Sequence, residues 1–168
     1  MNTHAYRLSR RTAFGLAGAA SATVALAACS NGDGKDYSGE VKFDSFERSG
    51  NYEPATKDKP AQNVPKPVKP SQMNEKSAAG FYAAIGYLAA AMQYLLEDLE
   101  PEPIIEVLGD SQGNYDQFKQ MKSSNLAWVI NPKVVISLKT PQPKVDGDTY
   151  TWDAKSTLKY DGIGSNVD

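Results

Sequence analysis

The longest hydrophobic pattern in this chain has the period of an α-helix. Large apolar residues recur at alternating steps of four and three, at Phe81, Ile85, Leu88, Met92, Leu95 and Leu99. This spacing predicts a helix of about 25 residues with one apolar face, capped at its start by Ser71 or Asn74 and ended by Pro101. Gly80 and Gly86 each disfavour a helix by about 1 kcal/mol relative to alanine, so we expect close backbone packing at both positions.

Two short helices are expected next, and after residue 125 the pattern changes to the alternation of β-strands. One helix covers Pro103 to Leu108 and the other begins near Asn114. The segments LAWVI, KVVISLKT and DTYTWDAKSTLKY then predict antiparallel strands. The expected fold class is therefore α+β, with three N-terminal helices packed on a small antiparallel sheet over residues 72–162, followed by a tail at 163–168.

Residues 29–71 show neither period. They are polar and end in KPAQNVPKPVKP, whose prolines favour an extended backbone, so we expect a flexible, disordered tether. The aromatic stretch YSGEVKFDSFERSGNYEP within it leaves three alternatives. It is part of the disordered linker, it docks on the domain as a further strand at the open edge of the sheet, or it docks on a partner.

Residues 1–28 have the pattern of a signal peptide. Three arginines precede the uncharged stretch 14–28, which as a helix would span roughly 22 Å and so fall short of the ~30 Å hydrocarbon core. The order Leu26-Ala27-Ala28-Cys29 resembles the lipobox of bacterial lipoproteins. That resemblance implies a cut before Cys29, diacylglycerol on its thiol and anchoring at the extracytoplasmic face of the cell membrane. SRRTAF also resembles a twin-arginine export signal, with the general export route as the alternative.

Composition excludes several kinds of chemistry from the processed chain. The single histidine, His4, belongs to the signal peptide, and the single cysteine is expected to carry lipid. Zinc, copper and non-haem iron sites draw mainly on imidazole and thiolate ligands, and Ser/His or Cys/His catalysis needs an imidazole, so we expect no catalytic residues, no metal and no cofactor. Loss of three arginines shifts the net charge from −2 to about −5, which disfavours a nucleic-acid partner.

Two further resemblances concern the folded domain. The helix-first order is similar, at the level of architecture, to the cone of the nuclear-transport-factor-2-like superfamily, although a full cone has more strands than we predict here. The lipobox, the stretch NYEPATKDKPAQNVPKP, the tyrosine-rich helix and GDTYTWDAKSTL together resemble a family of uncharacterised lipoproteins from high-GC Gram-positive bacteria. This second resemblance implies a location and a fold but no chemistry.

The candidate ligand-pocket residues are aromatic: Tyr87, Tyr94, Trp128, Tyr150 and Trp152. They could line a pocket between helix and sheet, where their hydroxyl and indole groups would orient a ligand. Alternatively, they fill the core of a domain that has few other large residues.

Two sets of polar residues are the remaining candidates for a functional site. The acidic run Glu97, Asp98, Glu100, Glu102 and Glu106 offers oxygen ligands for a weak Ca²⁺ site, but a solvated charged corner fits its spacing better. Asp153 with Tyr150 or Tyr87 could perform acid–base catalysis, although strand alternation puts Asp153 on the polar face.

These features predict a membrane-anchored extracytoplasmic lipoprotein that acts as a non-enzymatic binding or interaction module. Its partners would be the membrane, through the lipid on Cys29, and either a small apolar ligand or another protein. The alternative is a small hydrolase or isomerase that uses carboxylate and tyrosine groups in a cone-shaped pocket.

Replacing Cys29 with serine tests the anchor. Without the thiol, no thioether to diacylglycerol can form, so we expect the variant to lose fatty-acid label and to remain uncut or be released from the membrane. Metabolic labelling with a radioactive or clickable fatty acid, followed by fractionation, measures both effects. Equal labelling of the wild type and Cys29→Ser would contradict the lipobox interpretation.

Overall fold

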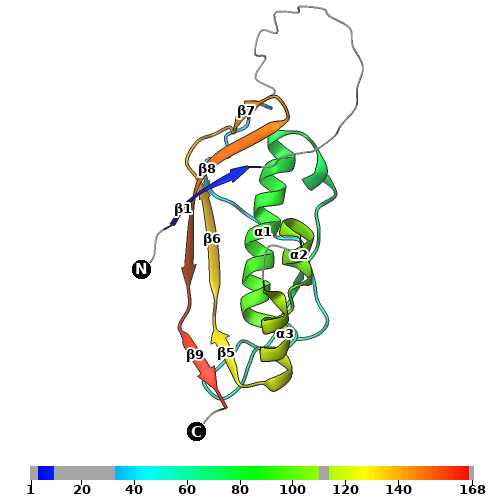
Figure 1. Ribbon diagram of the computed structural model, residues 1–168, viewed down its shortest axis with the longest axis vertical. Helices are drawn as coiled ribbons and strands as arrows, with labels where there is room; N and C mark the ends of the chain where they lie inside the picture. Colours follow the sequence, from blue (N-terminus) through cyan, green and yellow to red (C-terminus); the bar gives the residue numbers. More distant parts are fainter. Residues whose placement is uncertain (1–3, 10–32, 110–113, 167–168) are drawn as a thin grey trace, which may run out of the picture.

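The computed structural model describes residues 4–9, 33–109 and 114–166, so Cys29 and the apolar part of the signal peptide lie outside the described residues. Three helices pack on one side of a long antiparallel ribbon (Figure 1). The helices are α1 (Ala78–Asp98), α2 (Glu102–Leu108) and α3 (Tyr115–Ser124), with a short 3₁₀ helix η1 (Ser71–Asn74) before them. The strands are β1 (His4–Ser9), β2 (Gly39–Glu40), β3 (Phe46–Glu47), β4 (Lys66–Pro67), β5 (Ala127–Ile130), β6 (Lys133–Leu138), β7 (Lys144–Asp146), β8 (Thr149–Lys159) and β9 (Gly162–Ser165).

The α+β class is confirmed, but the expected order of its elements is wrong. Strands β1 to β4 precede α1, so the helices are not all N-terminal to the sheet. The reason is that parts of the polar segment before α1 pair locally, as β3 does with β4, or add to the sheet, as β2 does at β6. The expected C-terminal tail also begins too early, because β9 pairs with β5.

The predicted apolar face of α1 is confirmed as the centre of the core. Phe81, Ile85, Leu88 and Leu95 are buried in one cluster with residues of β6 and β8. The helix begins later than expected, since Ser77 is its N-cap and accepts a hydrogen bond from the Gly80 backbone N at 3.0 Å. Residues 71–74 form the separate turn η1 instead of the first turn of α1.

The main sheet has the order β1-β8-β6-β2, with β7 also paired to β8. All of its pairings are antiparallel, and β8 and β6 run side by side along the helices (Figure 1). The predicted alternation of β8 holds where the helices cover it, because Trp152 and Ala154 are buried. Farther along the same face, Leu158 is exposed.

The segment that we expected to be a flexible tether packs on the domain from residue 33 onward. Tyr37 and Val41 are buried in the main core cluster. The Val41 backbone N donates a hydrogen bond to the Ile136 carbonyl at 2.9 Å, which extends the pairing of β2 with β6. This placement agrees with the docked alternative and not with a disordered linker.

Among the described residues, α1 is the one helix long and apolar enough to cross a membrane by length and composition. Its most apolar window is 56% buried inside the protein, so this apolar surface forms the core.

Gly80 is expected to tolerate alanine poorly, although alanine is the better helix former. A Cβ at this position would lie 2.4 Å from the Glu75 carbonyl oxygen and 2.7 Å from that of Gln72, both of which are backbone atoms with little room to move. We expect Gly80→Ala to lower the free energy of unfolding by a net amount of about 1 to 3 kcal/mol, because the steric clash outweighs the ~1 kcal/mol that the better helix propensity of alanine contributes. Urea denaturation followed by circular dichroism measures it, and a more stable variant would contradict the close packing of η1 on α1.

Candidate functional site

A groove of about 600 Å³ runs between α1, the segment 40–52 and residues 131–134, which form the β5–β6 turn and the start of β6. We call it the α1 groove. Its three sides come from parts of the chain that are far apart in sequence. The size falls within the ~300–1,000 Å³ that small-molecule sites usually have.

Small residues of α1 form the floor of the α1 groove. Gly86, Ala89 and Ala90 leave a shallow apolar channel along the helix. Gly86 also lets the crossing chain come close, because a Cβ there would lie only 3.3 Å from the Lys42 carbonyl oxygen. The groove therefore exists where the chain crosses the small-residue side of the helix.

The segment 40–47 forms a fixed wall rather than a free loop. The Lys42 backbone N donates a hydrogen bond to the Tyr82 hydroxyl at 3.1 Å, which ties the wall to α1. Phe43 packs edge-on against Phe46, with ring centroids 5.2 Å apart, and contacts Tyr87 at 5.9 Å. Aromatic rings of this segment thus line the groove.

Cations outnumber carboxylates around the α1 groove, in a chain whose net charge is −2. Lys42, Arg48 and Lys133 line it together with Glu40 and Glu97. Lys42 forms an ion pair with Glu40 at 3.0 Å. Within the described residues, neither Arg48 nor Lys133 forms an ion pair or a side-chain hydrogen bond, but the charge of Lys133, after the larger effect of Lys42, helps to lower the pKa of Glu40. The rim thus carries positive charge that could attract an anion.

Glu97 lies at one end of the groove in a partly buried position. Its carboxylate accepts a hydrogen bond from the Tyr52 hydroxyl. Burial raises the pKa of Glu97 above its ordinary value, and the nearby Asp98 charge adds to this, against the lowering effect of the Tyr52 hydrogen bond. Burial and the Glu97 carboxylate likewise raise the pKa of the Tyr52 hydroxyl, so it remains a neutral donor near pH 7.

Of the five predicted ligand-pocket residues, the structure brings only Tyr94 to the α1 groove. Trp152 is fully buried and donates from its indole to the Thr140 carbonyl at 2.9 Å, and the buried Trp128 donates to the Thr56 carbonyl at 2.7 Å. The Tyr150 hydroxyl donates to the Lys76 carbonyl at 2.8 Å. These placements agree with the alternative that aromatic residues fill and fasten the core.

The sequence did not predict a site at the groove residues of the 40–52 segment. One local feature could have indicated it, since Phe43, Phe46 and Tyr52 are aromatic residues in an otherwise polar stretch. Their clustering against α1 depends on where the chain crosses the helix, and no local pattern specifies that crossing.

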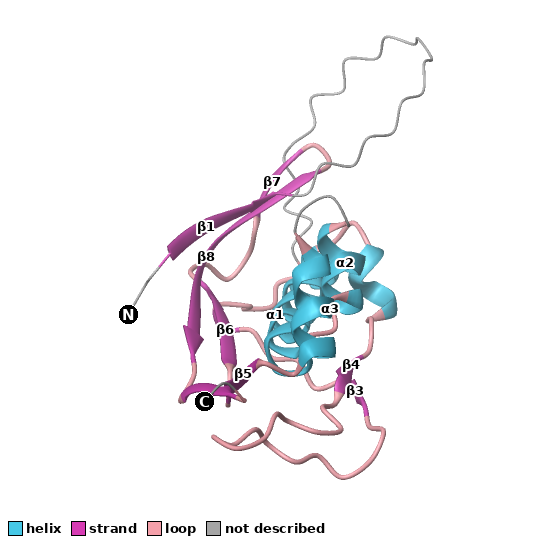
Figure 2. Cartoon of the chain, turned by 60° about the horizontal axis from the view of Figure 1, so that its bottom comes forward, coloured by secondary structure: helices cyan, strands magenta, loops and turns pink. Residues whose placement is uncertain are grey.

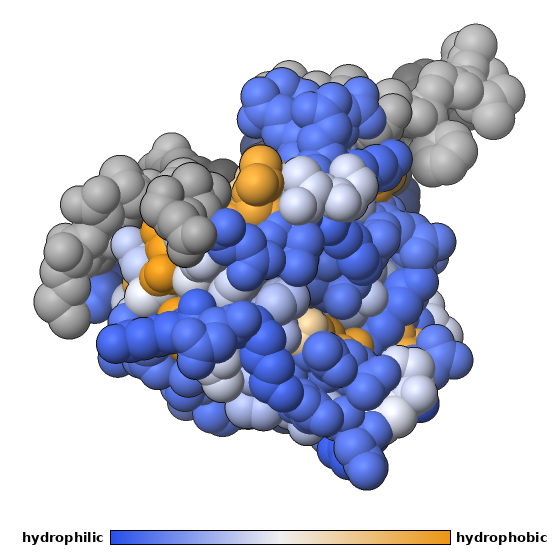
Figure 3. All heavy atoms as spheres, turned by 90° about the horizontal axis from the view of Figure 1, so that it is seen from below, coloured by the Kyte–Doolittle hydropathy of each residue, from blue (hydrophilic) through white to orange (hydrophobic). Residues whose placement is uncertain are grey.

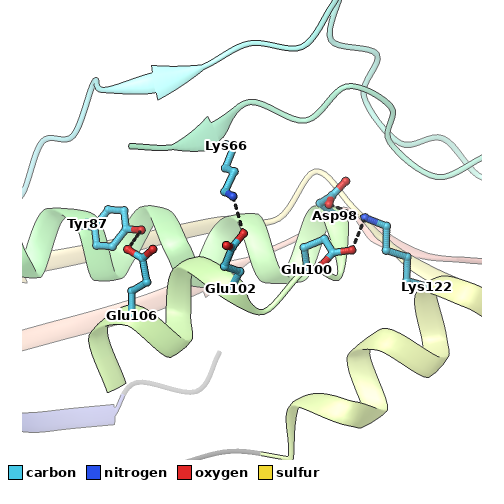
Figure 4. Close-up of polar contacts among 7 residues, drawn as sticks. All are labelled: Lys66, Tyr87, Asp98, Glu100, Glu102, Glu106 and Lys122. Atoms are coloured by element: carbon cyan, nitrogen blue, oxygen red, sulfur yellow. Dashed lines mark hydrogen bonds and ion pairs between the residues drawn. The ribbon is translucent and has the colours of Figure 1, made fainter. Parts of the chain in front are cut away.

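The acidic run between α1 and α2 forms ion pairs with lysines and accepts a hydrogen bond from a tyrosine (Figure 4). Lys122 of α3 contacts Asp98 at 2.7 Å and Glu100 at 3.1 Å. Glu102 pairs with Lys66 of β4 at 2.5 Å. No group of three or more metal-ligating side chains occurs within residues 4–9, 33–109 and 114–166. The run thus links α1, α2, α3 and β4 through surface ion pairs.

The carboxylate and tyrosines considered for catalysis do not meet. The Tyr87 hydroxyl donates to Glu106 at 2.9 Å (Figure 4), and Tyr150 is engaged with the backbone of Lys76. Asp153 lies between the buried Trp152 and Ala154 on β8, so its side chain points to the opposite, outer face of the sheet.

The described surface seen from below is mostly hydrophilic, with small apolar patches (Figure 3).

Residues 50–166 of the sequence match a family of unknown function, DUF6318. No curated protein and no solved structure matches the chain. The family match covers the helices and most of the sheet, but it begins after the first part of the groove wall.

The raised pKa of Glu97 makes a prediction about stability and pH. A carboxyl whose pKa is higher in the folded state opposes folding when it is ionised, and this cost disappears as the pH falls below its ordinary pKa of 4.5. We therefore expect Glu97→Gln, which keeps an acceptor for Tyr52, to raise the thermal midpoint at pH 7 and to lose that gain near pH 4. The matched control is Glu47→Gln at an exposed position, for which no pH-dependent gain is expected. A gain of equal size at both pH values would contradict the burial of the charge.

Proposed function

We propose that this chain, which belongs to the DUF6318 family, is a membrane-anchored extracytoplasmic lipoprotein that binds a ligand without chemical turnover. The ligand that the geometry favours is a small amphipathic anion held in the α1 groove. The observation that carries this proposal is the combination of an apolar, aromatic-lined groove with an excess of cations at its rim, of which Arg48 has no carboxylate partner within the described residues.

The anchor is supported by the sequence before the domain. A lipobox cysteine at position 29 would carry at least two acyl chains, and two chains hold a protein stably at a bilayer where one does not. The described part of the domain begins at residue 33, four residues after Cys29, so the domain would lie close to the lipid surface, where amphipathic molecules are concentrated.

The shape and polarity of the groove support the ligand class. Gly86, Ala89 and Ala90 leave room for an aliphatic or aromatic body, and Phe43 and Tyr94 provide ring surfaces for it to contact. An apolar body in such a site contributes roughly 25 cal/mol per Å² of buried surface. This term would account for most of the affinity.

The rim supports a negative head group rather than a positive one. Arg48 lacks a carboxylate partner among the described residues, so an anionic group would gain an ion pair with it without breaking an existing one. The guanidinium of Arg48 could bind a carboxylate, sulfonate or phosphate in a bidentate manner. Because these groups are exposed, their contribution would decrease with ionic strength.

The test uses two fluorescent probes that differ in charge. Anilinonaphthalene sulfonate has an aromatic body and an anionic group, and N-phenyl-1-naphthylamine has the same kind of body without charge. We expect both to bind the wild type. Ala90→Trp, which fills the floor of the groove, should weaken both by about tenfold or more, equivalent to ~1.4 kcal/mol.

The charge variants distinguish the contribution of the ligand's anionic head group to binding from that of its apolar body. Arg48→Glu should weaken the sulfonate by about threefold to tenfold at low salt and leave the neutral probe unchanged. Lys57→Glu makes the same charge change at an exposed position outside the groove and should affect neither probe. Undiminished binding of both probes to Ala90→Trp would contradict the groove as the site, and equal effects of Arg48→Glu and Lys57→Glu would contradict the anionic ligand.

A further inference from the structure

The outer edge of β8 is occupied by a strand that the processed protein would lack. Strand β1 pairs antiparallel with β8 from His4 opposite Ser156 to Ser9 opposite Thr151. It lies along the edge of β8 opposite β6 (Figure 2). Residues 4–9 belong to the signal peptide that the proposed function removes by a cut before Cys29. In the processed chain, this edge would therefore have no partner strand from residues 4–9.

The backbone groups along this edge can be assigned from the opposite one. The Asp153 carbonyl accepts a hydrogen bond from the Lys139 backbone N at 2.9 Å, so Asp153 directs its polar backbone groups toward the β6 side. Because these directions alternate along a strand, Trp152, Ala154 and Ser156 direct their N–H and C=O groups to the outer edge. Such unpaired groups in a row form a template for another strand.

We propose that this edge pairs with the same edge of a second copy of the chain, so that two sheets join into one across a two-fold axis. The inference rests on the proposed processing and does not depend on the ligand of the α1 groove. A two-fold interface brings one surface patch against itself, so the patch must be self-complementary. The side chains of β8 meet this requirement in one register.

Burial restricts the register first. Trp152 and Ala154 face the core, whereas Asp153 and Lys155 face outward. Strands in one sheet must match their inner faces, so the two-fold axis passes through a residue rather than between two residues. The central candidates are Asp153, Ala154 and Lys155.

Charge then selects among these three registers. A two-fold axis at Asp153 or Lys155 would place two like charges directly opposite each other, which destabilises a pair of strands. An axis at Ala154 places Asp153 of each copy opposite Lys155 of the other, which gives two opposite-charge pairs. These residues would form a non-hydrogen-bonded pair, in which the side chains lie closest.

The Ala154-centred register also covers exposed apolar surface. It places Leu158 of one copy opposite Tyr150 of the other on the inner face. Leu158 is 49% exposed in the single chain. Its burial favours the same register that the charges select.

The experiment compares the association of two forms of the protein by analytical ultracentrifugation. The first comprises residues 29–168 with Cys29→Ser, which corresponds to the processed chain without lipid, and the second is the full chain with the same substitution. We expect the processed form to dimerise and the full chain to remain monomeric, because β1 occupies the edge within the molecule at high effective concentration. Circular dichroism checks that both forms are folded.

Charge exchange tests the register. In the processed form, Asp153→Lys and Lys155→Asp each turn both symmetric pairs into like-charge pairs, and each should weaken the dimer about tenfold or more at low salt. The double variant Asp153→Lys with Lys155→Asp restores both pairs in the reverse sense and should return the dissociation constant to within about threefold of the parent.

Several results would overturn the inference. A folded processed form that stays monomeric at high concentration would do so, and binding of a peptide HAYRLS by such a monomer would show that the edge is open but not to a second copy. A dimer that neither single variant weakens would place the interface elsewhere. Ligand binding in the groove is tested separately by the fluorescent probes. Processing is tested separately by the mass of the N-terminal peptide of protein isolated from cells. A failure of the dimer proposal can therefore be distinguished from a failure of either of these.

Discussion

The packing around Trp152 holds the three parts of this protein together. Its side chain is completely buried, with the ring of Tyr37 edge-on at 5.7 Å and the ring of Phe81 at 5.8 Å. These residues belong to the central strand, to the segment before the helices and to α1. Large aromatic side chains bury much apolar surface, and a one-residue slip of β8 would turn Trp152 outward. The cluster therefore sets both the register of the sheet and the path of the N-terminal segment.

The α1 groove follows from that path. Tyr37 is held against Trp152 and Tyr82, so the chain leaving it must cross α1 a few residues later. The crossing occurs at Gly86, where the absence of a side chain allows the closest approach, and it carries Phe43 onto Tyr87. A polar stretch with few apolar residues is thus ordered by the burial of Tyr37 and Val41 and becomes the wall of the α1 groove. The charges of this stretch, including Arg48, are brought to the groove by the same docking.

The two proposed interaction surfaces use different parts of the fold. No residue that lines the groove belongs to β8, and the strand edge contributes nothing to the groove. A ligand and a second copy could therefore bind at the same time. The strand β1 adds a connection between export and assembly, since the segment that would direct export also covers the edge on which association would occur. The cut before Cys29 would then leave the chain anchored only by its lipid, and it would expose this edge of β8 in the same step.

The sequence by itself determined the elements whose residues repeat with a regular period. The apolar face of α1, the short helices bounded by Pro103, Gly109 and Asn114, and the alternation of β8 are local properties, because side-chain direction in a helix or strand depends only on spacing. The tertiary structure alone decided the fate of residues 33–71, the position of the groove and the partners of the acidic run. Docking of Tyr37, the approach at Gly86 and the ion pairs of Lys66 and Lys122 join residues far apart in the chain, and contacts of that kind leave no periodic trace in the sequence. A polar, proline-rich composition lowers the tendency of a segment to fold alone, but it does not prevent ordering on a core that the rest of the chain has already built.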